Sequence, residues 1–127
     1  MRIEMVTYET VAPFKAAAAK ERSIISNGER TYWFAAFDNG KIVGVNGANV
    51  SMTNLGRIKG TYVVPEHRGK GISKKLNQTV FDFLCYECLV SKINAFVTTD
   101  RNLAWYTKKG FKVKREKNGI AYVERNT

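Results

Sequence analysis

The chain has 127 residues, a length at which one domain buries about two-thirds of its unfolded surface without disulfides or bound metals. Apolar residues make up 44% of the chain and aromatic residues 12%, which excludes an intrinsically disordered protein. No apolar run reaches the roughly 18 residues that a membrane-spanning helix needs, and the N-terminus lacks the pattern of a signal peptide. We therefore expect a cytoplasmic protein that does not enter a membrane.

The net charge of +10 is concentrated in two segments of the chain. Residues 56–75 hold six basic side chains against one acidic, and residues 101–127 hold eight against two. A polarised distribution of this kind attracts polyanions or anionic ligands. A basic surface can equally serve solubility alone, so the charge does not decide between these interpretations.

The first half of the chain predicts one helix among several strands. Residues 3–7 form a short strand, and a helix begins around Pro13 and ends near Asn27-Gly28. Residues 32–37 and 42–50 form a hairpin that turns at Asp38-Asn39-Gly40, because an Asn-Gly pair tolerates positive φ. A turn over residues 52–54 leads into a strand that ends at Val64.

The second half predicts a long helix, a short helix and three strands. The helix after Gly71 extends to about Val90 and places one apolar stripe on its buried face: Ile72, Leu76, Val80, Phe83, Leu84 and Cys88. Residues 93–97 form a strand, and residues 101–109 form a helix closed by Gly110. A last hairpin over 111–115 and 121–125 turns at Asn118-Gly119. The order β-α-β-β-β-α-β-α-β-β predicts one α/β (α+β) domain over 1–127, with a mixed, mostly antiparallel sheet flanked by helices.

The segment between the strand ending at Val64 and the long helix predicts an anion site. Gly69 and Gly71 let the backbone approach a ligand closely, and the first turn of the helix presents unpaired N–H groups to it. Arg68 and Lys70 add positive charge. A pyrophosphate suits such a site, which indicates a phosphorylated cofactor.

Two cysteines lie inside the long helix, as Cys85 and Cys88. A structural zinc site needs four ligands, and the single histidine, His67, cannot complete a second pair at the usual spacing. We interpret both cysteines as helix packing residues and expect no metal site.

Two motifs, in the order of elements given above, resemble the GNAT superfamily of acetyl-coenzyme A-dependent N-acetyltransferases. The family's pyrophosphate loop, Arg/Gln-x-x-Gly-x-Gly/Ala, corresponds to Arg68-Gly69-Lys70-Gly71-Ile72-Ser73, with Ser73 in place of Gly or Ala. The family's Tyr-x-x-x-Gly-Phe corresponds to Tyr106-Thr107-Lys108-Lys109-Gly110-Phe111. The resemblance covers residues 30–115 well and both ends poorly.

The resemblance implies that the donor is acetyl-CoA and that its pyrophosphate binds the backbone N–H groups of residues 69–74. It implies further that the Val63 N–H polarises the acetyl carbonyl and that the pantetheine arm enters between strands 58–64 and 93–98. The residues assigned to cofactor binding are Val63, Val64, Arg68, Gly69, Lys70, Gly71, Ile72, Ser73, Lys74 and Asn102.

The resemblance also implies catalytic roles. Tyr106 matches the general acid that protonates the departing thiolate, or else it is an aromatic residue packed against the sheet. Many family members carry a basic Glu on the strand before the loop, and residues 57–62 contain no carboxylate. Asp100, Glu29, His67 or a bound water remain as candidates for the base. Asp100 is the preferred carboxylate, with a role as helix N-cap weighted equally.

Only residues 28–30 separate the expected first helix from the next strand, where family members have a second helix. This shortened acceptor-side region predicts an open cleft that suits a large substrate. Three functions stay open: an N-acetyltransferase acting on a primary amine of a protein, peptide or small molecule; an enzyme acylating a nucleic-acid base or a tRNA-borne amine; and a non-catalytic CoA-binding module. Nucleic acid would lie along Lys108, Lys109, Lys112, Lys114, Arg115 and Lys117. We expect a monomer or a homodimer.

Overall fold

A computed structural model describes residues 1–127. The strands are β1 (Arg2–Val6), β2 (Thr31–Asp38), β3 (Lys41–Val50), β4 (Leu55–Val63), β5 (Lys92–Val97), β6 (Lys112–Lys117) and β7 (Ile120–Asn126). The α-helices are α1 (Tyr8–Val11), α2 (Lys15–Lys20), α3 (Ile72–Asp82) and α4 (Asp100–Lys108). The predicted order of strands and helices is therefore confirmed, and none of the helices could cross a lipid bilayer.

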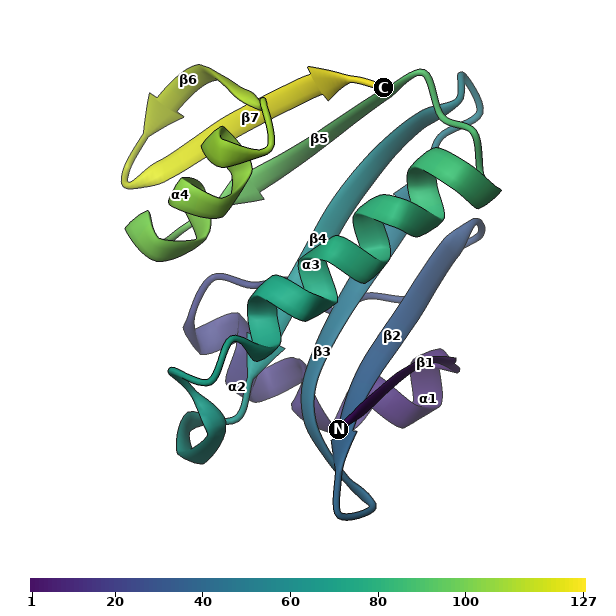
Figure 1. Ribbon diagram of the computed structural model, residues 1–127, viewed down its shortest axis with the longest axis vertical. Helices are drawn as coiled ribbons and strands as arrows, with labels where there is room; N and C mark the ends of the chain where they lie inside the picture. Colours follow the sequence, from purple (N-terminus) through teal and green to yellow (C-terminus); the bar gives the residue numbers. More distant parts are fainter.

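All seven strands belong to one sheet in the order β1-β2-β3-β4-β5-β7-β6. Every neighbouring pair is antiparallel except β4 and β5, which are parallel only from Leu55–Ile58 against Lys92–Ala95. Beyond these four pairs the two strands diverge, and Figure 1 shows them separating toward their carboxyl ends. The predicted splay between strands 58–64 and 93–98 is thus present, and it divides the sheet into two arms.

Two apolar clusters cover the two faces of the sheet. The larger cluster, of 21 buried residues, lies between the sheet and α3 and α4, with Leu76, Val80 and Leu84 fully enclosed. The smaller cluster, of seven buried residues around Trp33, lies under α1 and α2 on the other face. In Figure 1, α3 crosses in front of β3 and β4, while α1 and α2 lie behind.

The predicted helix from Pro13 to about Asn27 is wrong at both ends. It begins at Tyr8, capped by the Thr7 hydroxyl, passes through a 3₁₀ turn and ends at Lys20. The end is a Schellman motif, in which Arg22 has a φ of 61° and the backbone N–H of Ser23 donates to Ala18 O. Because an arginine instead of glycine occupies the left-handed position, the sequence shows no stop there. Ten residues, rather than three, separate the helix from β2.

The turns and helix ends that depend on neighbouring residues lie close to their predicted positions. Both hairpins turn at the predicted Asn-Gly pairs, and all four turn residues have positive φ. Gly110 closes α4 with a φ of 89°. The long helix continues past α3 as a π-helical turn over Phe83–Glu87 and stops at Leu89, one residue before the predicted end. Cys85 and Cys88 pack against the larger cluster, as predicted.

Candidate active site at the splay of the sheet

The inner edge of β4 is open where β5 leaves it. Val64 N–H donates to Val43 O at 2.9 Å, so Val63, one residue earlier, directs its N–H and C=O toward the other edge of the strand. On that edge β5 pairs only as far as Ile58. The Val63 amide therefore faces the cleft, whereas the Val64 amide, also predicted to bind cofactor, is occupied by β3.

A β-bulge bends β4 at this point. Asn46 on β3 faces two residues of β4, Gly60 and Thr61, since Val45 pairs with Tyr62 and Gly47 with Lys59. Gly60 has a φ of 65°, and a Cβ on it would lie 2.5 Å from the Trp33 ring. Only glycine fits this position, so the bulge is built into the sequence.

The loop before α3 has the unpaired donors that the sequence predicted. The backbone N–H groups of residues 69–74 donate to no backbone or side-chain acceptor, and Gly71 as N-cap supplies no side-chain bond. Gly69 and Gly71 have φ values of 82° and 78°, and a Cβ on either would meet nothing within 4 Å. Ile72 is buried, while Lys70 and Lys74 are exposed at the rim. The arrangement can hold an anion by these unpaired donors and the helix dipole.

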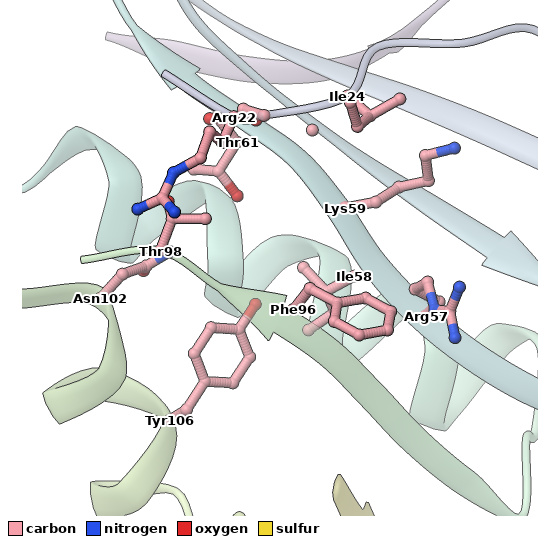
Figure 2. Close-up of a pocket in the computed structure, with 12 residues that line it drawn as sticks. Arg22, Ile24, Arg57, Ile58, Lys59, Thr61, Phe96, Thr98, Asn102 and Tyr106 are labelled. Atoms are coloured by element: carbon pink, nitrogen blue, oxygen red, sulfur yellow. Dashed lines mark hydrogen bonds between the residues drawn. The ribbon is translucent and has the colours of Figure 1, made fainter. Parts of the chain in front are cut away.

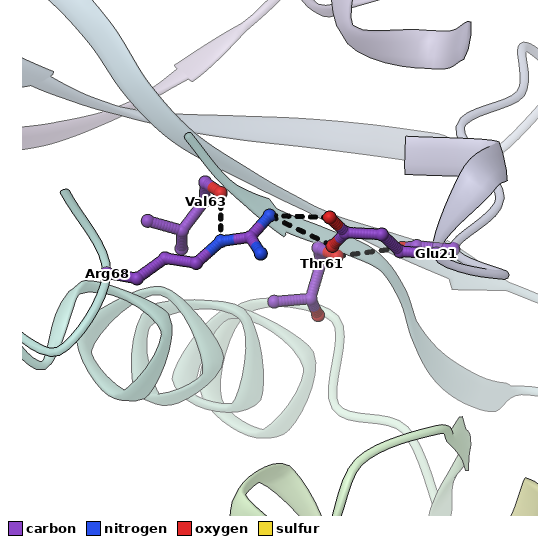
Figure 3. Close-up of polar contacts among 5 residues, drawn as sticks. Glu21, Thr61, Val63 and Arg68 are labelled. Atoms are coloured by element: carbon purple, nitrogen blue, oxygen red, sulfur yellow. Dashed lines mark hydrogen bonds and ion pairs between the residues drawn. The ribbon is translucent and has the colours of Figure 1, made fainter. Parts of the chain in front are cut away.

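The Arg68 side chain makes hydrogen bonds within the protein. Its Nε donates to Val63 O at 2.9 Å, and one terminal nitrogen donates to both carboxylate oxygens of Glu21, at 2.9 and 2.8 Å (Figure 3). Ser23 Oγ donates to Thr61 O at 2.8 Å beside it. Arg68 thus ties the segment after α2 to the open edge of β4, and its charge is compensated by Glu21 rather than added to the anion site.

A cavity of about 340 Å³ lies between β4 and β5 where the two strands diverge. The segment after α2, β4, β5 and α4 all contribute to its wall, which is formed by Arg22, Ser23, Ile24, Arg57, Ile58, Lys59, Gly60, Thr61, Phe96, Thr98, Asn102 and Tyr106. Figure 2 shows the Tyr106 hydroxyl directed from α4 toward the space between β4 and β5. The cavity therefore lies where a ligand threaded between the two arms would end.

Tyr106 is enclosed everywhere except at its hydroxyl. The side chain is 2% exposed, and its ring makes edge contacts with Trp105 and Phe111, each at 5.0 Å between centroids. The hydroxyl makes none of the side-chain hydrogen bonds in the structure and borders the cavity. Burial raises the pKa of Tyr106 above its ordinary value of 10.0. The phenol is therefore protonated at neutral pH and free to donate into the cavity.

A row of hydrogen-bonded amides connects β3 to α3 and α4. Asn46 Nδ2 donates to Asn77 Oδ1 at 2.7 Å, and Asn77 Nδ2 donates to Asn102 Oδ1 at 2.8 Å. Thr61 Oγ1 donates to Asn46 Oδ1 at 3.0 Å. Asn46 and Asn77 are completely buried. This row orients Asn102, the predicted cofactor contact, so that its Nδ2 remains free at the cavity wall.

No acidic side chain and no histidine lines the cavity. Asp100 is exposed in the first turn of α4, and the N-cap is Thr99, whose hydroxyl accepts from Asn102 N at 3.2 Å. The N-cap role considered for Asp100 is therefore wrong, because the preceding threonine has it. Glu29 is exposed, and His67 Nε2 lies 3.6 Å from Asp38 Oδ2, away from the cavity.

Sequence reasoning missed most of the cavity wall. Arg57 and Lys59 were counted only as charge, and Arg22 lay inside the misplaced helix. Asn46 stands among apolar and small residues of its strand, which was an available indication of a buried polar contact. The hairpin of β6 and β7, called the basic hairpin below, lies next to this wall, because Arg22 Nη1 donates to Asn118 O at 2.7 Å. All six residues of β6 are exposed.

Comparison with known proteins agrees with this geometry. The acetyltransferase (GNAT) family profile matches residues 1–111. No curated protein sequence matches the chain. An IAA acetyltransferase from Bacillus cereus is 19% identical, with a TM-score of 0.74 and 99% of each chain covered.

Two further similar structures contain acetyl coenzyme A or coenzyme A. The N-acetyltransferase PseH of Campylobacter jejuni, in complex with acetyl coenzyme A, is 18% identical, with a TM-score of 0.71 and 99% of each chain covered. The PaiA N-acetyltransferase of Thermoplasma acidophilum, in complex with coenzyme A, is 16% identical, with a TM-score of 0.74 and 100% of each chain covered. At these identities the likeness concerns the fold. The family match over residues 1–111 shows that the chain belongs to the GNAT family of acyl-CoA-dependent N-acetyltransferases.

Proposed function

We propose that this enzyme transfers the acetyl group of acetyl-CoA to a primary amine by direct attack of the amine on the thioester. The observation that supports this most strongly is the presence of three groups along β4 and the splay beside it. These are the unpaired N–H groups of residues 69–74, the open Val63 edge of β4 and the unpartnered Tyr106 hydroxyl. Together they suit a phosphate-bearing donor whose reactive end lies between the arms.

In the proposed mechanism the pyrophosphate binds residues 69–74, and the pantetheine adds alongside β4 like an extra strand. The Val63 N–H donates to the acetyl oxygen as negative charge develops on it. Asn102 Nδ2 is placed to contact the same arm. Lys70 and Lys74 contribute charge from the rim.

The chemical step exchanges a C–S bond for a C–N bond. The amine nitrogen attacks the thioester carbonyl carbon, and the tetrahedral intermediate expels the coenzyme as a thiolate. Tyr106 gives its proton to that sulfur, a contribution of roughly 10²–10⁴ in rate. The nitrogen loses one proton, which passes through water and restores the phenol. The products are an N-acetylated amine and free CoA.

The test is turnover of acetyl-CoA with a broad panel of amines, in which thiol release is measured together with the acetylated product by mass spectrometry. We expect one thiol for each N-acetyl group formed. Binding of acetyl-CoA without turnover of any amine would favour the non-catalytic module instead.

A second candidate acceptor is an amine on a nucleic-acid base or a tRNA. The specific observation in its favour is that Arg22 joins the cavity wall to the turn of the exposed basic hairpin. Lysines on an edge strand also have a simpler role, since they discourage pairing between sheets of different molecules. Acetylation of tRNA with a steep dependence of binding on salt concentration would support this candidate.

A further inference from the structure

The cavity wall contains three cations and no anion. Arg22, Arg57 and Lys59 line it, and none of them forms an ion pair with a carboxylate. This contrasts with Arg68, a short distance along the chain, whose guanidinium is compensated by Glu21. Positive charge that no carboxylate of the protein compensates attracts anionic ligands to the cavity.

Neutral partners hold each cation in place without cancelling its charge. Arg57 Nε donates to Asn94 Oδ1 at 2.7 Å, and its guanidinium stacks 4.9 Å from the centre of the Phe96 ring. Lys59 Nζ donates to Ser26 Oγ at 2.6 Å. Arg57 retains the donors of its terminal nitrogens, and the Lys59 ammonium retains two further N–H groups. The two heads are therefore fixed by the fold while most of their donors remain available.

The phosphates of the donor do not account for this charge. They belong at residues 69–74, beyond the carboxyl end of β4, whereas Arg57 lies near its amino end. At roughly 3.3 Å per residue, about 13 Å of β4 separate Lys59 from Val63, a distance that the acetyl thioester on the Val63 N–H and a short acceptor beyond it would fill. The pantetheine between the phosphates and the thioester is uncharged. Arg57 and Lys59 thus lie on the acceptor side of the thioester.

We propose, on the basis of the acetyltransferase function above, that the acceptor is a small amine that also carries a carboxylate or a phosphate, which Arg57 and Lys59 bind. A cavity of about 340 Å³ has the size of a small-molecule site. Arg22 adds a third positive charge to the cavity wall. The acceptor's anion then orients its amine toward the thioester.

Arg57 and Lys59 would also favour deprotonation of the acceptor's ammonium group, the step that a carboxylate base would otherwise promote. Positive charges near an ammonium group favour its neutral form, so the bound acceptor loses a proton to water more easily than it does in solution. Lys59 shows the effect on a side chain, because burial and then the charge of Arg57 lower its pKa. A neutral amine is the nucleophile that the reaction needs.

The first experiment compares matched amines as acceptors: β-alanine against propylamine, and O-phosphoethanolamine against ethanolamine, with spermidine as a polycation. We expect kcat/KM to be higher for the anionic member of at least one pair by about 10- to 100-fold. The two pairs distinguish a carboxylate from a phosphate. Equal or faster acetylation of the members without an anionic group, of spermidine, or of tRNA alone would overturn the proposal.

The second experiment uses Arg57→Gln and Lys59→Gln, with Lys41→Gln as the matched control on the exposed β2–β3 hairpin. The preference for the anionic amine should shrink by about tenfold in each cavity variant and stay unchanged in the control. Circular dichroism confirms that the variants are folded, and Arg57→Lys should restore part of the preference. A preference that survives both cavity variants would contradict the assignment.

The third experiment separates this proposal from the proposed function. Inorganic phosphate and acetate are titrated by calorimetry into protein saturated with CoA, so that the loop before α3 is already occupied. We expect binding of at least one anion, lost in Lys59→Gln and retained in Lys41→Gln. Failure of CoA itself to bind would defeat the acetyltransferase function. Binding of CoA without binding of either anion would defeat only the anionic acceptor.

Discussion

The two ends of the cleft attract negative charge by different means. At the end formed by residues 69–74 the donors are backbone N–H groups, held open by two glycines and a helix terminus. At the end formed by Arg57 and Lys59 the donors are side chains, held by Asn94 and Ser26. Backbone donors need only a short local motif, whereas side-chain donors need partners from distant segments. A short stretch of sequence is therefore enough to form the donor end, whereas the acceptor end depends on how distant segments fold together.

The largest effect should come from the residue between the two ends. Tyr106→Phe removes the proton donor while the packing of the ring remains, so kcat should fall by about 10²–10⁴ with little change in the affinity for acetyl-CoA. Steady-state kinetics with calorimetry measure both quantities. Tyr86→Phe, on a side chain that is 75% exposed, is the control. A kcat within a factor of about two of wild type would exclude the acid role.

Gly71→Glu should disable the donor end alone. A carboxylate placed among the phosphate donors costs several kcal/mol of binding, which corresponds to a rise of more than about 100-fold in the Kd of acetyl-CoA. Gly40→Glu is the matched control, because Gly40 has a φ of 76° and a Cβ there also meets nothing within 4 Å. Both variants carry the same charge and a left-handed strain of about 1–3 kcal/mol. Equal affinities in the two would refute the pyrophosphate site.

Asn77→Ala tests the row of amides, Asn46, Asn77 and Asn102, that joins β3 to α3 and α4. The change leaves Asn46 Nδ2 and Asn102 Oδ1 without their partners, and at least the first of these is buried. The free energy of unfolding should fall by about 1–3 kcal/mol. Urea denaturation measures it, with Gln78→Ala as a neighbouring control. An unchanged midpoint would mean that water replaces the lost amide.

Alkaline unfolding probes the enclosure of Tyr106. The folded state raises the pKa of this phenol above 10.0, so between the two values the folded chain keeps a proton that the unfolded chain has released. The tyrosine's contribution to stability is complete below pH 10, and above it the free energy of unfolding falls by up to about 1.4 kcal/mol per pH unit. Tyr106→Phe should lose this component of the slope. Identical slopes would show that the phenol is solvated.

The smallest effect is expected from Arg68, although its motif position suggested a direct role. Because Glu21 compensates it at the surface, Arg68→Gln should lower stability by no more than about 1 kcal/mol. The Kd of acetyl-CoA should change by less than about fivefold, well below the effect of Gly71→Glu. A loss of affinity as large as that of Gly71→Glu would place the guanidinium on the phosphates after all.

Most of the fold and the donor end could be predicted because their causes are local. The Asn39-Gly40 and Asn118-Gly119 turns, the left-handed Gly71 and the apolar stripe of α3 each depend on residues a few positions apart. The Tyr106 position followed from a short motif, and its burial followed from the apolar residues beside it. Such features can be predicted from the sequence because backbone sterics and helical periodicity act on residues that are neighbours in the sequence.

The acceptor end was decided by tertiary structure. Arg57 meets Asn94 from 37 positions away, and Lys59 meets Ser26 from 33. Arg68 finds Glu21 across 47 positions, which removes it from the anion site. The α2 helix ends at a left-handed arginine because Ser23 and Glu21 bind β4 and Arg68, and no local rule encodes that stop. Whether a charge is cancelled or left for a ligand depends on which distant side chain folding brings to it.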